Sequence, residues 1–128
     1  MTQDLNSLPR EMRDNYEKAL SSIKRGNHDY AIEILSNLVA IKQDFAQARH
    51  LLRVSQRLSY KESPPHLIVK FINFLISIIY SIKAIIFNLK NEPSLAIREY
   101  EKILSYDPFK KSVLIRLAKI FMLMGLKE

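Results

Sequence analysis

Residues 84–118 read AIIFNLKNEPSLAIREYEKILSYDPFKKSVLIRLA, and two interruptions divide this stretch into three helical segments. The run Asn91–Pro93 ends one helix and begins another, because proline is tolerated in the first turn of a helix but not in its interior. Asp107 followed by Pro108 predicts a further helix start, with the aspartate as the cap and the proline as the first helical residue. The stretch therefore predicts antiparallel helices joined by short turns.

On either side of this stretch, apolar residues recur at helical spacing, and glycine or proline separates the runs. Gly26 ends the first run, and Asn27 is expected to cap the next helix. The chain has only two glycines in 128 residues, which favours long helices over β-rich folds with their many glycine turns. The sequence predicts an all-α fold of about six helices, over residues 10–25, 28–41, 45–60, 66–89, 93–106 and 108–125.

Small and aromatic residues repeat at fixed distances from these turns. Ala96, Tyr100 and Ile103 lie 12, 8 and 5 residues before Pro108. Ala84 and Ala118 are 34 residues apart, whereas Ala19 and Ala84 are 65 apart, three residues short of twice that distance, which predicts a broken middle repeat. Alanine at such positions lets two helix axes approach to about 8–9 Å, while the larger residues fill the space beside it. The spacing therefore predicts helix pairs that stack on one another.

These positions resemble the tetratricopeptide repeat family, whose period is 34 residues, and the run RGNHDYAI at 25–32 resembles it too. The resemblance implies one domain, 1–128, that forms an α-α superhelix of antiparallel helix pairs. Its parts would be a first repeat (12–45), a degenerate repeat (46–76), a third repeat (77–110) and a half repeat or capping helix (111–128). It also implies a protein–protein interaction scaffold or adaptor, in which the first helices of the pairs line a groove for a peptide or partner helix.

Basic residues supply the candidates for such a groove, and the chain carries a net charge of +7. Arg49, Arg53, Arg57 and Lys61 recur every four residues and form one stripe on the third helix. Its opposite face is apolar, so we expect the stripe to face solvent. An acidic protein or peptide is the expected partner, because arginine pairs well with carboxylates, whereas nucleic acid is disfavoured for want of interleaved aromatic residues. The partner-binding candidates are Lys24, Arg49, Arg53, Arg57, Arg116 and Lys119.

The segment Leu67–Leu89 reads LIVKFINFLISIIYSIKAIIFNL and is long enough to span a bilayer, which takes about 20 residues. Polar or small residues form a narrow stripe along it: Lys70, Asn73, Ser77, Ser81, Ala84 and Asn88. Three interpretations stay open: a buried repeat helix, a helix in or on a membrane that anchors an adaptor, and an apolar helix that forms a homo-oligomer. The expected location is cytoplasmic, with membrane association as the alternative.

No residue is predicted to act in catalysis or to bind a metal or cofactor. The chain has no cysteine, its three histidines are far apart in sequence, and no glycine-rich phosphate loop or HExxH motif occurs. Residues 1–10 are polar and lack the apolar core of a secretory signal peptide. We therefore expect a binding protein and not an enzyme.

Overall fold

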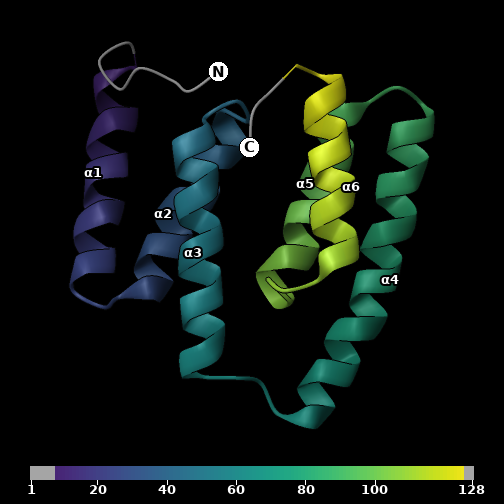
Figure 1. Ribbon diagram of the computed structural model, residues 1–128, viewed down its shortest axis with the longest axis horizontal. Coiled ribbons are helices and arrows are strands. Elements are labelled where there is room, and N and C mark those ends of the chain that lie inside the picture. Colours follow the sequence, from purple (N-terminus) through teal and green to yellow (C-terminus); the bar gives the residue numbers. More distant parts are fainter. Residues whose placement is uncertain (1–7, 126–128) are drawn as a thin grey trace. The chain divides into compact units, whose positions relative to one another are not determined.

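A computed structural model describes residues 8–125, and these residues form six α-helices and no β-strand (Figure 1). The predicted all-α fold, with one long apolar helix among six, is confirmed. The helices are α1 (Arg10–Lys24), α2 (His28–Ile41), α3 (Ala46–Glu62), α4 (Leu67–Leu89), α5 (Pro93–Tyr106) and α6 (Lys111–Leu123).

The predicted start of the last helix is wrong by three residues. Asp107 still belongs to the end of α5, since its backbone N–H donates to the carbonyl of Ile103 at 2.9 Å. Its carboxylate Oδ1 accepts a hydrogen bond from the backbone N–H of Phe109 at 3.3 Å. The aspartate therefore closes a turn around Pro108 instead of capping a helix, and α6 begins only at Lys111.

The described residues divide into two compact units. The first unit comprises residues 8–59 and Gly125, and therefore contains α1, α2 and most of α3. The second comprises residues 60–124, with the end of α3 followed by α4, α5 and α6.

The first unit has an apolar core formed mainly by buried side chains of α1, α2 and α3. Tyr16 of α1 packs its ring 5.2 Å from that of Phe45, which precedes α3. Around this pair lie small and branched side chains that α1, α2 and α3 turn inward, and most polar residues of α1 face outward. The buried apolar residues of this core are Leu8, Tyr16, Ala19, Ala31, Leu35, Leu38, Val39, Phe45, Ala48 and Leu52.

The second unit is built around α5, which packs along α4 and also contacts α6. Most of its buried apolar side chains come from α5 and α6, whereas α4 contributes one small residue, Ala84. These buried residues are Ala84, Ala96, Ile97, Tyr100, Ile103, Leu104, Val113, Leu117, Ile120 and Phe121.

The α1–α2 and α4–α5 hairpins have the same turn. Gly26 follows α1 with a φ of +79°, and Asn91 follows α4 with a φ of 58°. In each turn two backbone N–H groups donate back to the last carbonyls of the preceding helix, which is the Schellman motif. These bonds are Gly26 to Ile23 at 3.0 Å and Asn27 to Ser22 at 2.8 Å, and Asn91 to Asn88 at 3.2 Å and Glu92 to Phe87 at 2.9 Å.

This shared turn relates the two hairpins by an offset of 65 residues. Ala19 and Ala31 of the first hairpin then correspond to Ala84 and Ala96 of the second, and all four are fully buried. A methyl side chain at these positions allows the paired helices to approach closely. The two hairpins are therefore equivalent in their turns and in their helix crossings.

Candidate functional site

Helix α4 turns small and polar residues of its middle turns toward its neighbour and most of its large apolar residues outward. Ser77 and Ala84 are the buried residues of α4, and Asn73 and Ser81 are half-buried. All four belong to the polar stripe seen in the sequence. Because α5 is the helix packed along α4, this stripe is the face by which α4 joins the protein.

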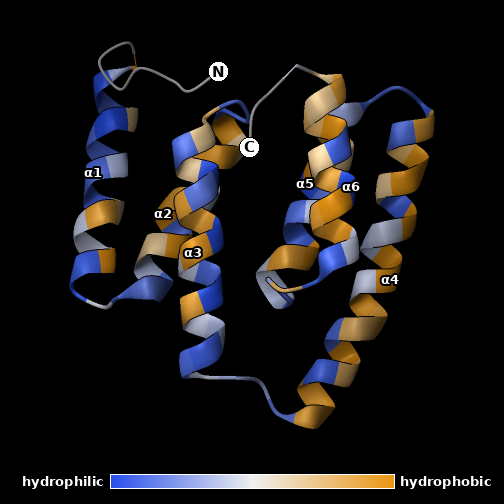
Figure 2. Cartoon of the chain, in the orientation of Figure 1, coloured by the Kyte–Doolittle hydropathy of each residue, from blue (hydrophilic) through white to orange (hydrophobic). Residues whose placement is uncertain are grey.

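The exposed residues of α4 are mostly apolar, and most of this helix is orange in the hydropathy colouring of Figure 2. Of the 22 exposed large hydrophobic residues between positions 8 and 125, thirteen lie on this helix. By length and composition it is the one helix in the described part of the chain that could cross a membrane, and only 11% of its most apolar window is buried. The thirteen residues are Leu67, Ile68, Val69, Phe71, Ile72, Phe74, Leu75, Ile78, Ile79, Ile82, Ile85, Ile86 and Leu89.

The equivalent helix of the first hairpin is polar on its outward face. At the 65-residue offset, Asp14, Glu17, Ser21 and Lys24 of α1 correspond to Ile79, Ile82, Ile86 and Leu89 of α4, and all eight are exposed. The hairpin therefore forms without apolar residues at these positions. Since exposed apolar patches of this extent mark interaction surfaces, the face of α4 is a candidate binding surface.

The charged groups beside α4 lie at the edge of this apolar surface. The ammonium group of Lys83 lies 5.8 Å from the ring centre of Tyr80, on the side of the helix that borders the polar stripe. Lys102 of α5 approaches the same ring at 5.3 Å and pairs with Glu99 at 3.3 Å. Lysine stems commonly cover apolar surface in this way while their charged ends reach toward water.

The second unit is strongly basic around α4. Between Tyr60 and Met124, ten lysines and arginines stand against five acidic residues. Residues 67–89 contain no aspartate or glutamate, and Lys70, Lys83 and Lys90 are all exposed. The apolar surface is thus bordered by positive charge, which favours contact with an anionic surface.

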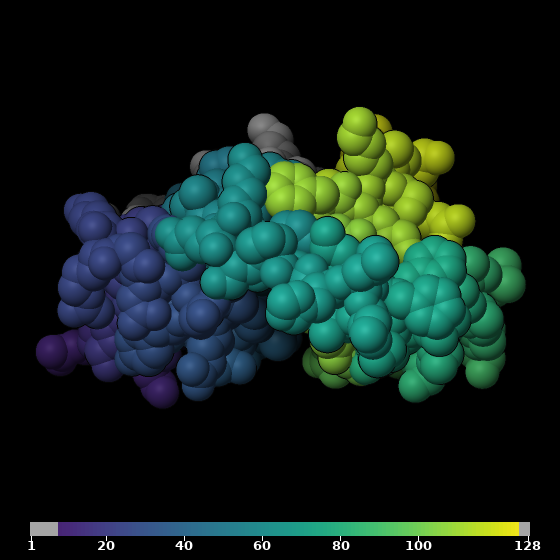
Figure 3. Space-filling model, turned by 90° about the horizontal axis from the view of Figure 1, so that it is seen from below, coloured from purple at the N-terminus to yellow at the C-terminus, as the bar shows by residue number. Residues whose placement is uncertain are grey.

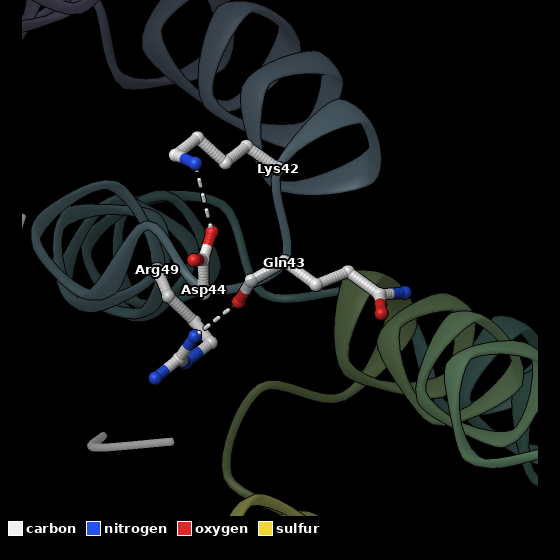
Figure 4. Close-up of polar contacts among 4 residues, drawn as sticks. All are labelled: Lys42, Gln43, Asp44 and Arg49. Atoms are coloured by element: carbon white, nitrogen blue, oxygen red, sulfur yellow. Dashed lines mark hydrogen bonds and ion pairs between the residues drawn. The ribbon is translucent and has the colours of Figure 1, made fainter. Parts of the chain in front are cut away.

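The predicted basic stripe of α3 does not face solvent along its whole length. Arg49 and Arg53 are only 1% and 5% exposed, whereas Arg57 is half-buried and Lys61 is exposed. Arg49 donates through Nη1 to the backbone carbonyl of Gln43 at 2.5 Å (Figure 4). The expectation of a solvent-facing stripe is therefore wrong for its first two members, because a guanidinium with a carbonyl partner can be buried.

The turn that holds Arg49 is itself closed by polar contacts. Lys42 Nζ lies 3.3 Å from Asp44 Oδ1 (Figure 4), and the backbone N–H of Phe45 donates to the carbonyl of Lys42 at 3.1 Å. Arg53 donates to Gln56 Oε1 at 3.4 Å within α3. Arg49 thus joins the α2–α3 turn to the first turns of α3.

The remaining basic candidates are exposed but lie in different units. Lys24 is in the last turn of α1, in the first unit, whereas Arg116 and Lys119 are on α6, in the second. The last two are three residues apart and therefore neighbours on the helix surface. A single groove that contains all three stays a prediction. Among residues 8–125, no group of three His, Asp or Glu side chains could hold a metal ion.

The chain matches no protein-family model, no curated protein sequence and no solved structure.

Proposed function

We propose that this protein is a membrane-attached helical adaptor that rests on a membrane through the outward face of α4. The observation that carries the proposal is the reversed orientation of this helix, with the buried Ser77 and Ala84 on its inner side and its large apolar residues outside. In a helix that serves the core of a soluble protein, the apolar face points inward. A lipid surface is the environment that stabilises the reverse arrangement.

The helix would lie in the plane of the membrane and not cross it. Because α5 packs along α4, a crossing α4 would carry α5 into the hydrocarbon layer. Arg98 and Lys102 of α5 are exposed, and each charge at the centre of a bilayer costs about 2.5–3.5 kcal/mol. An in-plane helix buries its apolar face to a depth of about 5–10 Å and leaves these charges in water.

The charges along α4 favour a lipid surface over a second copy of the chain. Lys70, Lys83 and Lys90 lie on or next to this helix, which has no acidic residue of its own. Two copies that met along α4 would bring like charges together. An anionic membrane attracts the same charges, by about 1 kcal/mol for each lysine near the surface.

The adaptor part of the proposal rests on the remaining helices. Exposed basic residues on them, Lys24, Arg116 and Lys119, suit an acidic protein or peptide partner. Helix pairs with close alanine crossings, such as the two hairpins here, are the building units of repeat proteins that hold partners. We therefore propose that the membrane contact places this partner-binding array at a membrane surface.

Flotation of the full chain with lipid vesicles tests the membrane contact. We expect the wild type to float with vesicles that contain anionic lipid. The variant Ile79→Asp/Ile82→Asp should bind roughly 30- to 1,000-fold more weakly, because each lost isoleucine contact is worth about 1–2 kcal/mol when partly buried. Both isoleucines are more than half exposed, so the variant should keep its helical fold, which circular dichroism would verify.

The matched control is Ile115→Asp/Met122→Asp, which makes the same change of charge at two exposed positions of α6. This variant should bind vesicles like the wild type. A wild type that stays unbound and forms a dimer in solution, with a monomeric Ile79→Asp/Ile82→Asp variant, would contradict the proposal and assign α4 to a homodimer interface. Unfolding of that variant in the absence of lipid would instead show that α4 is a buried helix.

A further inference from the structure

The second unit contains a cleft at the N-terminal end of α4, with a volume of about 210 Å³. Its walls come from the end of α3, the first half of α4 and the turn between α5 and α6, which lies against the start of α4 in Figure 3. Pockets for drug-sized ligands measure roughly 300–1,000 Å³, so this cleft suits a small group. The lining residues are Tyr60, Pro65, Lys70, Asn73, Phe74, Ser77, Tyr106, Asp107 and Lys110.

Two lysines give the cleft its charge. Lys70 comes from α4, and Lys110 directly precedes α6. The ammonium group of Lys110 lies 5.5 Å from the ring centre of Phe74, which holds it at the wall of the cleft. Neither lysine forms an ion pair with another residue between positions 8 and 125. The lining thus carries two lysines and one carboxylate, Asp107, which leaves the cleft with a net positive charge.

Polar groups on the floor and sides of the cleft can complete an anion site. Ser77 is only 2% exposed and lines the cleft, and its hydroxyl makes no hydrogen bond to another residue of the described chain. This hydroxyl can therefore donate a hydrogen bond to a group bound in the cleft. Asn73 can donate from its amide beside it. Asp107 is the one acidic residue of the lining, and its Oδ1 already accepts the Phe109 N–H at 3.3 Å.

We infer that this cleft binds the phosphate of an anionic lipid headgroup, with Lys70, Lys110 and Ser77 as its ligands. The inference rests on the proposed function, because it places the headgroup where α4 meets the membrane. Leu67 and Phe71, at 83% and 63% exposed, lie on the same first turns of α4 and would contact the acyl chains of that lipid. Lysine is a common phosphate ligand that acts as a point charge.

Vesicles of equal surface charge but different headgroups test this inference with the full chain. One set contains phosphatidylserine and the other contains a lower proportion of phosphatidate, whose phosphomonoester is the better ligand for two lysines and a hydroxyl. We expect the wild type to prefer phosphatidate at least 10-fold. Lys70→Gln/Lys110→Gln should remove this preference, and Ser77→Ala should reduce it about 10-fold, the worth of one hydrogen bond from a hydroxyl to a charged group.

The matched control is Lys83→Gln/Lys90→Gln, which removes the same charge from two exposed lysines of the α4 region outside the cleft. This variant should bind all vesicles more weakly but keep the preference for phosphatidate. Equal binding of both vesicle sets, with equal losses in the two lysine variants, would overturn the headgroup site and leave the membrane contact of α4 intact.

Soluble glycerol phosphate, added to the chain without vesicles, separates the two sources of phosphate. Competition by glycerol phosphate for phosphatidate vesicles, lost in Lys70→Gln/Lys110→Gln, would support the headgroup site. A chain that binds glycerol phosphate but no vesicles would overturn the lipid assignment together with the proposed function. Circular dichroism and thermal unfolding of each variant would show whether a loss of binding reflects a loss of fold.

Discussion

The α1–α2 and α4–α5 hairpins share a turn and a pair of buried alanines, yet their first helices show opposite surfaces to their surroundings. In α1 the exposed positions carry Asp14, Glu17 and Lys24, and in α4 the corresponding positions carry Ile79, Ile82 and Leu89. The turn hydrogen bonds and the small residues at the crossing are enough to form a hairpin in both cases. The outward face is therefore free to match its environment, which is water for α1 and, in our proposal, lipid for α4.

The largest effect that tests this comparison is expected from one apolar truncation in each hairpin. Leu35→Ala removes a side chain that is fully buried in the first unit and should lower the free energy of unfolding by about 2–5 kcal/mol. Ile79→Ala removes a side chain that is 56% exposed and should change it by less than about 0.5 kcal/mol. Urea unfolding followed by circular dichroism, without lipid or detergent, measures both values.

The difference between these two variants is the decisive quantity. A loss of several kcal/mol for Ile79→Ala would mean that other parts of the protein cover the apolar face of α4. The comparison of the hairpins would then fail, and α4 would be an ordinary core helix.

A smaller effect is expected when the alanine crossings are enlarged. Ala19→Leu and Ala84→Leu each insert a larger side chain at a fully buried position and should cost about 1–3 kcal/mol of unfolding free energy. Similar losses of unfolding free energy in the two variants would support the conclusion that the α1–α2 and α4–α5 helix crossings are equivalent. Ile85→Leu, at the exposed neighbour of Ala84, is the control and should be neutral in the same urea titration. If Ala84→Leu left the free energy of unfolding unchanged, the polar stripe of α4 would not be the face that packs against α5.

The smallest effect concerns the alkaline stability of the first hairpin. Burial against Phe45 raises the pKa of Tyr16 above its ordinary value of 10.0. The Tyr16 hydroxyl binds its proton more tightly in the folded state than in the unfolded state, so the protonated tyrosine favours the fold. This contribution to the free energy of unfolding is complete below pH 10 and is lost as the pH rises above 10. Tyr16→Phe keeps the ring and removes the ionisation, so its stability should decline less steeply above pH 10, by at most about 1.4 kcal/mol per pH unit.

Urea unfolding at pH 9, 10 and 11 would measure this slope for the wild type and for Tyr16→Phe. Tyr30→Phe, which removes a hydroxyl from an exposed ring, is the control. Parallel curves for the wild type and Tyr16→Phe would show that the tyrosine is accessible to water in the folded state.

Helix positions were largely predictable because local signals specify them. Gly26 and Pro93 mark helix boundaries through their backbone conformations, and Asn27 caps α2 by accepting the Tyr30 N–H at 3.3 Å. The prediction that a helix starts at Asp107 and Pro108 is wrong because the same dipeptide suits both a helix start and a turn. The choice between them depends on the contact of α6 with α5, which local sequence does not contain.

The candidate surface was only partly predictable. The polar stripe of α4 was visible in the sequence, but periodicity alone does not say whether a stripe faces solvent or another helix. The burial of Arg49 was missed because its partner is the backbone carbonyl of Gln43, which no side-chain pattern reveals. The cleft lysines Lys70 and Lys110 are 40 positions apart in the chain, and the turn between α5 and α6 brings them to the same cleft.

The sequence by itself determined the six helices, most of their boundaries and the apolar character of residues 67–89, since all three follow from interactions between residues close in the chain. The tertiary structure decided which side of α4 packs against α5. Ser77 and Ala84 let α5 approach closely, and that close packing leaves most isoleucines of α4 on the outside. The direction of a helix face depends on the surface that its neighbour offers, and this surface is assembled only when distant segments meet.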